Sequence, residues 1–150
     1  MIIHEDFDFS EETFDIALVK LKSSLNLTKH TPACLPDMAS TFVGRTAWVY
    51  GWGAVSNASY FEQEYAVNED DYEYPELLTE TTQTVVTNER CANFYPNRDI
   101  APNHLCAHNL GHDICTGDNG APLTLEENGK HTLIGVALLG GKTCARVSFF

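Results

Sequence analysis

Short apolar runs separated by turn residues dominate the pattern of this chain. Runs rich in β-branched and aromatic residues predict strands at 14–21, 47–52, 78–86, 121–125 and 131–139. The first of these has the composition of a buried strand. Many short strands with glycine and proline between them indicate an antiparallel β-barrel or sandwich.

Cap and turn residues add detail to this pattern. Thr87 is placed to cap a short helix over 88–95. Asn128-Gly129 separates the last two predicted strands, and both positions tolerate the positive φ of a tight hairpin turn. Gly51 inside a predicted strand indicates a bulge or a close approach of another segment.

Residues 57–76 interrupt the strand pattern. They contain no Lys or Arg and show neither a helical nor a strand period, so we expect an exposed acidic loop insertion. The acidic stretch from Glu62 to Glu80 lacks the alternating ligands and central glycine of an EF-hand loop. A solvated loop is therefore favoured over a calcium site.

Charge and composition exclude several function classes. The 150 residues carry 9 basic and 21 acidic side chains, a formal charge of −12, which argues against nucleic acid or an anionic membrane as a partner. No apolar run reaches the roughly 20 residues that a membrane span needs. The first residues have neither the basic start nor the apolar stretch of a signal peptide.

The cysteine count points to an oxidising compartment. An odd number suggests two disulfides and one thiol that is free or paired elsewhere; the five are Cys34, Cys91, Cys106, Cys115 and Cys144. Two Asn-x-Ser/Thr sequons, at Asn26 and Asn57, agree with export. We therefore expect an extracellular protein whose true beginning lies upstream of this sequence.

One stretch carries the strongest functional signal. Cys115-Thr-Gly-Asp-Asn-Gly-Ala-Pro-Leu123 resembles the Cys-x-Gly-Asp-Ser-Gly-Gly-Pro-Leu motif around the nucleophile of trypsin/chymotrypsin-like serine peptidases. Further motifs resemble that family in the same order along the chain: Asp15-Ile-Ala-Leu18, Ala33-Cys-Leu-Pro36, Trp48-Val-Tyr-Gly-Trp-Gly53, Asn88-Glu-Arg-Cys91, Leu105-Cys-Ala107 and Cys144-Ala-Arg146. Six ordered matches over nearly the whole chain make the resemblance specific.

The resemblance implies a mainly-β, chymotrypsin-like fold with one short helix, in which the second antiparallel barrel is largely present and the first mostly missing. Residues 1–33 would be a remnant of the first barrel and 34–46 the connector. Residues 47–150 would form the second barrel, with the insertion at 57–76. The final stretch, 144–150, is expected to skip the strand that closes the substrate pocket and to stop before the terminal helix of the family.

The resemblance also assigns roles to single residues. Asp15 would be the relic of the triad aspartate, and Gly117 would supply an oxyanion-hole backbone group. Asp113 and Gly140 would line a substrate pocket that selects Arg or Lys side chains. Disulfides would join Cys91 to Cys106 and Cys115 to Cys144, and Cys34 would be free or paired with an upstream segment.

A third disulfide of the family is absent. Its two positions are occupied by Ala47 and Leu125. The joint loss of both cysteines is expected if these positions face each other.

Three departures from the family pattern bear on catalysis. The nucleophile position holds Asn119, whose amide nitrogen is delocalised into its carbonyl and cannot attack a peptide bond. Only 14 residues precede Asp15, and His4 lacks the Ala-Ala-His-Cys context of the base. The new N-terminus that pairs with the aspartate at Asp118 in this family is also missing.

Two other site readings are weaker. Cys106 and Cys115 with His108 and His112 have zinc-like spacing, but the family matches explain these cysteines better. New catalytic roles for His104, these two histidines or Cys34 would need a nucleophile–base pair that the pattern does not predict. We therefore expect neither a metal nor a cofactor.

Three functions remain open. The chain would be a non-catalytic, secreted serine protease homologue that binds or regulates a protein or peptide partner. Alternatively, it is an incomplete sequence of a serine endopeptidase that cleaves after Arg or Lys. As a truncated product with an unclosed barrel, it would expose strand edges that aggregate.

Overall fold

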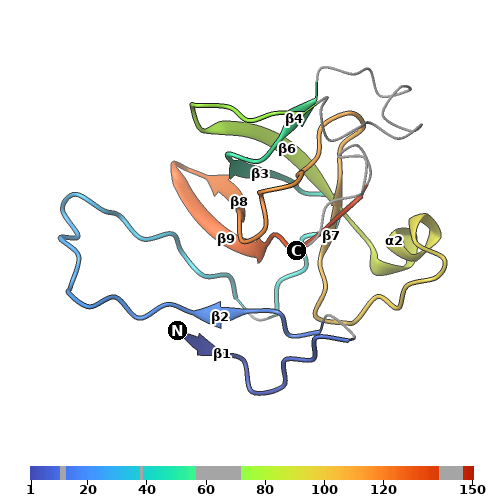
Figure 1. The fold of residues 1–150 in the computed structure, drawn as a ribbon, viewed down its shortest axis with the longest axis horizontal. Coiled ribbons are helices and arrows are strands. Elements are labelled where there is room, and N and C mark those ends of the chain that lie inside the picture. Colours follow the sequence, from blue (N-terminus) through green and yellow to red (C-terminus); the bar gives the residue numbers. More distant parts are fainter. Residues whose placement is uncertain (11–12, 38, 57–71, 139–146) are drawn as a thin grey trace.

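A six-stranded antiparallel sheet forms the body of the molecule, and two small two-stranded sheets accompany it (Figure 1). The computed structural model describes residues 1–10, 13–37, 39–56, 72–138 and 147–150. Its elements are β1 (Ile2–Ile3), β2 (Ala17–Leu18), β3 (Thr46–Gly51), β4 (Val55–Ser56), β5 (Tyr72–Glu73), β6 (Thr79–Val86), α2 (Asn88–Phe94), β7 (Cys106–His108), β8 (Pro122–Glu127), β9 (Lys130–Val136) and β10 (Ser148–Phe149).

The two outer strands of the large sheet approach each other. The strand order is β10-β7-β6-β3-β8-β9. Just beyond β9, the Leu138 amide donates a hydrogen bond to the Phe149 carbonyl of β10, with 3.0 Å between the nitrogen and the oxygen. Ser148 and Phe149 also pair with β7, so β10 lies between β7 and the end of β9. The expectation that residues 144–150 skip the pocket-closing strand concerns a region of which 139–146 lie outside the described residues, and it stays a prediction.

The strand register explains the pair of missing cysteines. Strands β3 and β8 are antiparallel, with Trp48 opposite Thr124 and Val49 opposite Leu123. One step along, this register sets Ala47 opposite Leu125, and both side chains are buried. The prediction that these two positions face each other is confirmed, and apolar packing replaces the covalent link.

The hairpin between β8 and β9 follows its turn residues. Asn128 and Gly129 have φ values of 52° and 71°, as a two-residue hairpin turn with positive φ at both positions requires. The strands on each side pair from Glu127 with Lys130 up to Pro122 with Val136. This hairpin predicted from sequence is confirmed.

The short helix α2 begins where its cap residue predicts. The Thr87 hydroxyl accepts a hydrogen bond from the Arg90 amide at 3.1 Å, which satisfies one of the free amides of the first turn. The helix buries Cys91, whose disulfide to Cys106 ties it to β7. Among the residues that the structure describes, no helix is long and apolar enough to cross a membrane.

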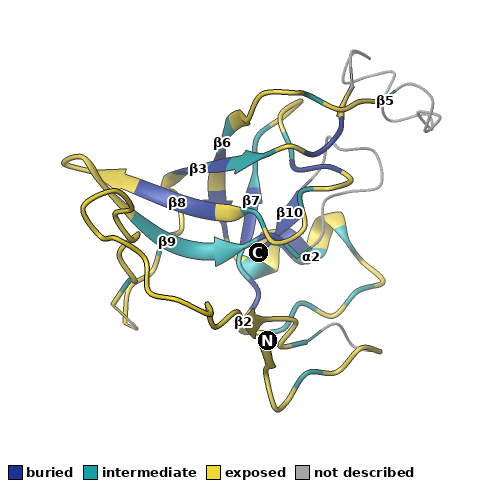
Figure 2. Ribbon diagram, turned by 60° about the vertical axis from the view of Figure 1, so that its left-hand side comes forward, coloured by how far each residue is buried: buried dark blue, intermediate teal, exposed yellow. Residues whose placement is uncertain are grey.

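The buried core lies in and around the large sheet (Figure 2). One cluster takes its residues from β3, β7, β8 and the segments that follow β7, β9 and β10, and a second takes them from β6, α2, β7, β10 and the residue before β10. The larger cluster consists of Ala47, Val49, Ala107, Ile114, Leu123, Leu125, Ala137 and Phe150, and the smaller of Val86, Cys91, Cys106, Val147 and Phe149. The mainly-β fold class with one short helix is thus confirmed for the described residues.

The N-terminal segment departs from the prediction. We expected 14–21 to be a buried strand, but only Ala17 and Leu18 pair, with Ile3 and Ile2, and Leu18 is 69% exposed. Figure 2 shows β2 and the chain around it almost wholly in the exposed colour. The prediction was wrong because a β-branched run forms a buried strand only where other strands cover it.

Candidate functional site

The turn that connects residue 115 to β8 is held from two sides. On one side, the Ala54 amide donates to the Thr116 carbonyl at 2.8 Å. On the other, the Gly120 amide donates to the Ala137 carbonyl at 2.7 Å. Gly117 has a φ of 99°, which only glycine adopts readily, so the sequence places it where the backbone requires it. The turn is therefore fixed by the ends of β3 and β9.

The Asp118 carboxylate stabilises this turn by accepting hydrogen bonds from two backbone amides. One carboxylate oxygen, Oδ1, accepts the Gly53 amide at 2.7 Å, and Oδ2 accepts the Cys115 amide at 3.0 Å. A Cβ atom built on Gly51 would lie 1.9 Å from Oδ1, and one on Gly53 would lie 2.3 Å from the carboxyl carbon. Gly51 is thus explained by close packing rather than by a bulge.

Asn119 sits on the exposed side of the turn. Within the described ranges, no hydrogen bond joins its side chain to Asp15 or to a histidine. A carboxamide is neutral and carries no proton that a neighbouring base could remove to make a nucleophile. This position therefore offers a hydrogen-bonding amide rather than an attacking group.

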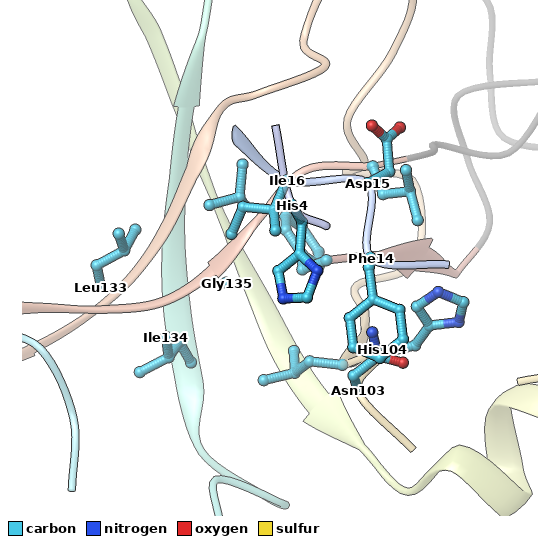
Figure 3. Close-up of a pocket in the computed structure, with 13 residues that line it drawn as sticks. His4, Phe14, Asp15, Ile16, Asn103, His104, Leu133, Ile134 and Gly135 are labelled. Atoms are coloured by element: carbon cyan, nitrogen blue, oxygen red, sulfur yellow. The ribbon is translucent and has the colours of Figure 1, made fainter. Parts of the chain in front are cut away.

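Asp15 lines a cavity of about 390 Å³ between the N-terminal segment and the end of β9. His4, His104 and apolar side chains from β9 share this cavity, and the Asp15 carboxylate points away from both imidazole rings (Figure 3). The His4 Nδ1 accepts the Asp6 amide at 3.1 Å, and the His104 Nδ1 accepts the Ala101 amide at 3.2 Å. Asp15 is exposed, so water solvates it and it needs no buried partner.

Asp113 is half-buried and held by two donors. Its Oδ1 accepts the Ile114 amide at 2.7 Å and the Gln83 side-chain amide at 3.0 Å. Asp113 also lines a cavity of about 310 Å³ together with Asp118, Glu80 and the glycines at the end of β3. The structure thus brings Asp113 and Asp118 to one cavity, while Asp15 lines another.

The disulfide that the resemblance implied between Cys91 and Cys106 is confirmed. Cys91 and Cys106 form a disulfide across 15 residues, and Cys115 is also disulfide-bonded. This removes the two thiolates that a zinc site between Cys106 and Cys115 would need, and the described residues hold no group of three metal-ligating side chains. Cys34 is a free, exposed thiol.

Some predicted site residues lie outside the described residues. These are Gly140 of the substrate pocket, Cys144 as the partner of Cys115, and the part of the acidic insertion from 57 to 71. The rest of that insertion includes β5, which pairs with β4.

Sequence reasoning missed two residues near the site. Gln83 is fully buried beneath Asp113, and its place among Thr and Val residues of a predicted strand was the available signal. Tyr74 has a ring carbon 3.8 Å from where a Cβ on Gly117 would lie. No motif pointed to this tyrosine, because it belongs to the segment interpreted as a loop insertion.

Comparisons with known proteins agree with this geometry. The family model described as Trypsin matches residues 1–149. The serine proteinase stubble of Drosophila melanogaster is 29% identical, over 99% of this chain and 19% of its own length. Bovine (Bos taurus) coagulation factor XI is 32% identical, over 93% of this chain and 21% of its own. Human (Homo sapiens) testisin is 35% identical, over 85% of this chain and 40% of its own length. The chain thus spans about a fifth to two fifths of the length of these relatives.

Proposed function

We propose that this chain, which belongs to the trypsin family, is a non-catalytic homologue of serine endopeptidases and binds a protein or peptide partner. The observation that carries the proposal is Asn119, at the position of the family's nucleophile in the turn before β8. An amide nitrogen there cannot form the acyl intermediate on which serine peptidase chemistry depends.

The rest of the turn supports a binding role. Gly117 has a φ of 99°, and Asp118 accepts hydrogen bonds from two backbone amides that hold the turn; in this proposal the Gly117 backbone lies at the place of the family's oxyanion hole. We propose that Asp113, with Gly140, receives a basic side chain of the partner, because Asp113 lines a cavity of about 310 Å³ and the family resemblance gives its carboxylate this role. Asp15 is then a relic of the triad with no catalytic task.

We further propose that the protein works outside the cell. The Cys91–Cys106 disulfide and the disulfide-bonded Cys115 support this, since such bonds persist in oxidising compartments. The partner would then be an extracellular protein or peptide.

The catalytic half of the proposal is tested by turnover. We expect the oxidised chain to show no hydrolysis of fluorogenic Arg and Lys peptides and no labelling by serine-directed phosphonates, in an assay where an active trypsin-family enzyme reacts with both. Robust hydrolysis that disappears in the Asn119→Ala variant would overturn the proposal.

The binding half is tested with short peptides that carry one Lys or Arg, by calorimetry. We expect Asp113→Asn to weaken binding about tenfold, because a charge-assisted hydrogen bond is lost. Glu126→Gln, a charge change at an exposed site on β8, is the matched control. Equal affinity of the Asp113→Asn variant would show that this aspartate is not the contact.

A second candidate is a serine endopeptidase that cleaves after Arg or Lys. It is favoured by the retained Asp113 and by the cavity of about 310 Å³ beside Asp118. If the chain is part of a longer peptidase, adding the upstream segment and changing Asn119→Ser should give cleavage after basic residues. If that variant does not cleave peptides after Arg or Lys, this candidate function is eliminated.

A further inference from the structure

We infer that Asn26 is a site of N-linked glycosylation, and that its glycan covers apolar side chains of the exposed N-terminal segment. The inference rests on the proposed extracellular function, because this modification takes place in the secretory pathway. Asn26-Leu27-Thr28 has the Asn-x-Ser/Thr sequence that the modification requires, with no proline at the middle position. The structure adds the orientation of the side chain and its surroundings.

The orientation of the Asn26 amide follows from its neighbours. Its Oδ1 accepts hydrogen bonds from the Thr28 backbone amide at 2.9 Å and from the Thr28 hydroxyl at 2.7 Å. A backbone N–H only donates, so the oxygen of the side-chain amide, and not its nitrogen, must face it. The nitrogen Nδ2, the atom to which a glycan is attached, lies on the other branch of the amide, and no hydrogen bond within the described part of the chain engages it.

The turn that carries this side chain is closed within itself. The Asn26 carbonyl oxygen accepts the Lys29 amide at 3.0 Å and the His30 amide at 3.1 Å. Together with the contacts to Thr28, these hydrogen bonds all join residues 26–30. Asparagine is common in such turns because its side chain bonds the backbone two residues further on. A group attached to Nδ2 therefore breaks none of the hydrogen bonds that hold the turn.

The surroundings of the turn leave space for a large group. Every residue from 14 to 35 is exposed, and Figure 2 shows the chain around β2 almost wholly in the exposed colour. Leu25 and Leu27, on either side of Asn26, are 53% and 66% exposed. A glycan is bulky and solubilising, so on Asn26 it shields these two leucines from contact with other molecules.

The modification requires a glycosyl donor of a defined class, an oligosaccharide carried on a lipid diphosphate. Nδ2 of Asn26 forms a bond to the anomeric carbon of the sugar and loses one proton to a base of the transferase. The bond from that carbon to the diphosphate oxygen breaks, and the lipid diphosphate leaves with the electron pair. Asn26 supplies only the nitrogen that receives the sugar.

The test uses the whole chain, secreted from cultured eukaryotic cells behind an added signal peptide. Trypsin cleaves after Lys22 and Lys29 and releases peptide 23–29, which contains Asn26 and no other Asn-x-Ser/Thr sequence. We expect mass spectrometry to find this peptide glycosylated, and to find an aspartate at residue 26 once an N-glycosidase has removed the glycan. The same digestion without the glycosidase measures spontaneous deamidation.

Two substitutions at residue 28 form a matched pair. Thr28→Ala removes the hydroxyl that the modification requires, so the glycan on Asn26 should be lost. Thr28→Ser keeps a hydroxyl, so the glycan should remain. A co-expressed secreted glycoprotein shows that the transferase is active in each culture.

The covering role is tested on protein that has already folded. Glycosidase treatment removes the glycan after secretion, so the comparison does not depend on whether Thr28→Ala folds in the cell. We expect the treated protein to self-associate at a concentration at which the untreated protein sediments as a monomer. Replacing Leu25 and Leu27 together by Ser keeps the Asn-x-Thr sequence and should abolish this self-association, because the exposed apolar surface is gone.

The outcomes separate this inference from the proposed function. An unmodified peptide 23–29 in the secreted chain overturns the inference, while the extracellular function still has the support of its disulfides. A glycan on Asn26 whose removal leaves the protein monomeric overturns the covering role. If Cys91 and Cys106 are free thiols in the secreted chain, the extracellular function fails whether or not Asn26 is glycosylated. A glycan that Thr28→Ala abolishes and Thr28→Ser keeps, with self-association on its removal, supports the inference.

Discussion

The N-terminal segment, residues 1–37, and the six-stranded sheet show how differently the same pattern behaves in two settings. The run at 14–21 and strand β6 are both short and rich in β-branched residues. β6 pairs on both sides, with β3 and β7, and buries Gln83, Val85 and Val86. The first run pairs over two residues with β1 and leaves Leu18 and Val19 exposed. Burial is decided by what covers a strand, not by its composition alone.

The aspartates of the two regions differ in the same way. Asp113 and Asp118 are anchored by strands and amides of the large sheet, so their carboxylates have fixed positions. Asp15 belongs to the exposed segment, where water is its partner. Of the residues that the family resemblance singled out, those built on the sheet keep a defined geometry.

The largest expected effect comes from one substitution made in both regions. Phe149 of β10 is fully buried, packs on the Tyr95 ring at 4.8 Å between centroids, and lies under the Arg98 guanidinium. Phe149→Ala should lower the free energy of unfolding by about 3–5 kcal/mol because it leaves a cavity in the core. Phe9 is 87% exposed, and Phe9→Ala should change the free energy of unfolding by less than about 0.5 kcal/mol.

Urea unfolding followed by tryptophan fluorescence measures both variants. Equal losses in the two would mean that the N-terminal segment is as well packed as the sheet. A Phe149→Ala variant of unchanged stability would mean that β10 does not complete the large sheet in solution.

The second comparison uses the cysteines of the two regions. Replacing Cys91 and Cys106 together by Ala should cost about 3 kcal/mol, since their disulfide closes a loop of 15 residues. Cys34→Ser, in the N-terminal segment, should have almost no effect, because this thiol is exposed and free. Thermal unfolding of the oxidised proteins checks the pair, and a large loss in Cys34→Ser would show that this thiol has a partner in solution.

The sequence predicted the parts of the molecule that depend on local chemistry. Thr87 and Asn128-Gly129 act through hydrogen bonds and φ values within a few residues, so the helix start and the hairpin turn were found. The family motif located the turn that holds Asn119 for the same reason. The contact of Gln83 with Asp113 joins residues 30 apart, and no motif contains both.

The error at residues 14–21 also has a physical cause. Whether that run is buried depends on pairing between distant segments. Hydrophobic periodicity gives the face of a strand but not its neighbour.

The smallest expected effect concerns hydrogen bonds from side chains to backbone. The Thr87 hydroxyl caps α2, and Thr87→Ala should cost about 1 kcal/mol, because the Arg90 amide then lacks its partner at a helix end fixed by the Cys91–Cys106 disulfide. The Asn26 side chain makes a similar local contact, accepting the Thr28 amide at 2.9 Å, but in an exposed turn of the N-terminal segment. Water can replace that contact, so Asn26→Ala should change stability by less than about 0.5 kcal/mol. If urea unfolding showed equal losses of unfolding free energy in the two variants, this kind of hydrogen bond would contribute equally in both regions. The difference between the anchored sheet and the exposed segment would then not extend to hydrogen bonds between side chains and backbone.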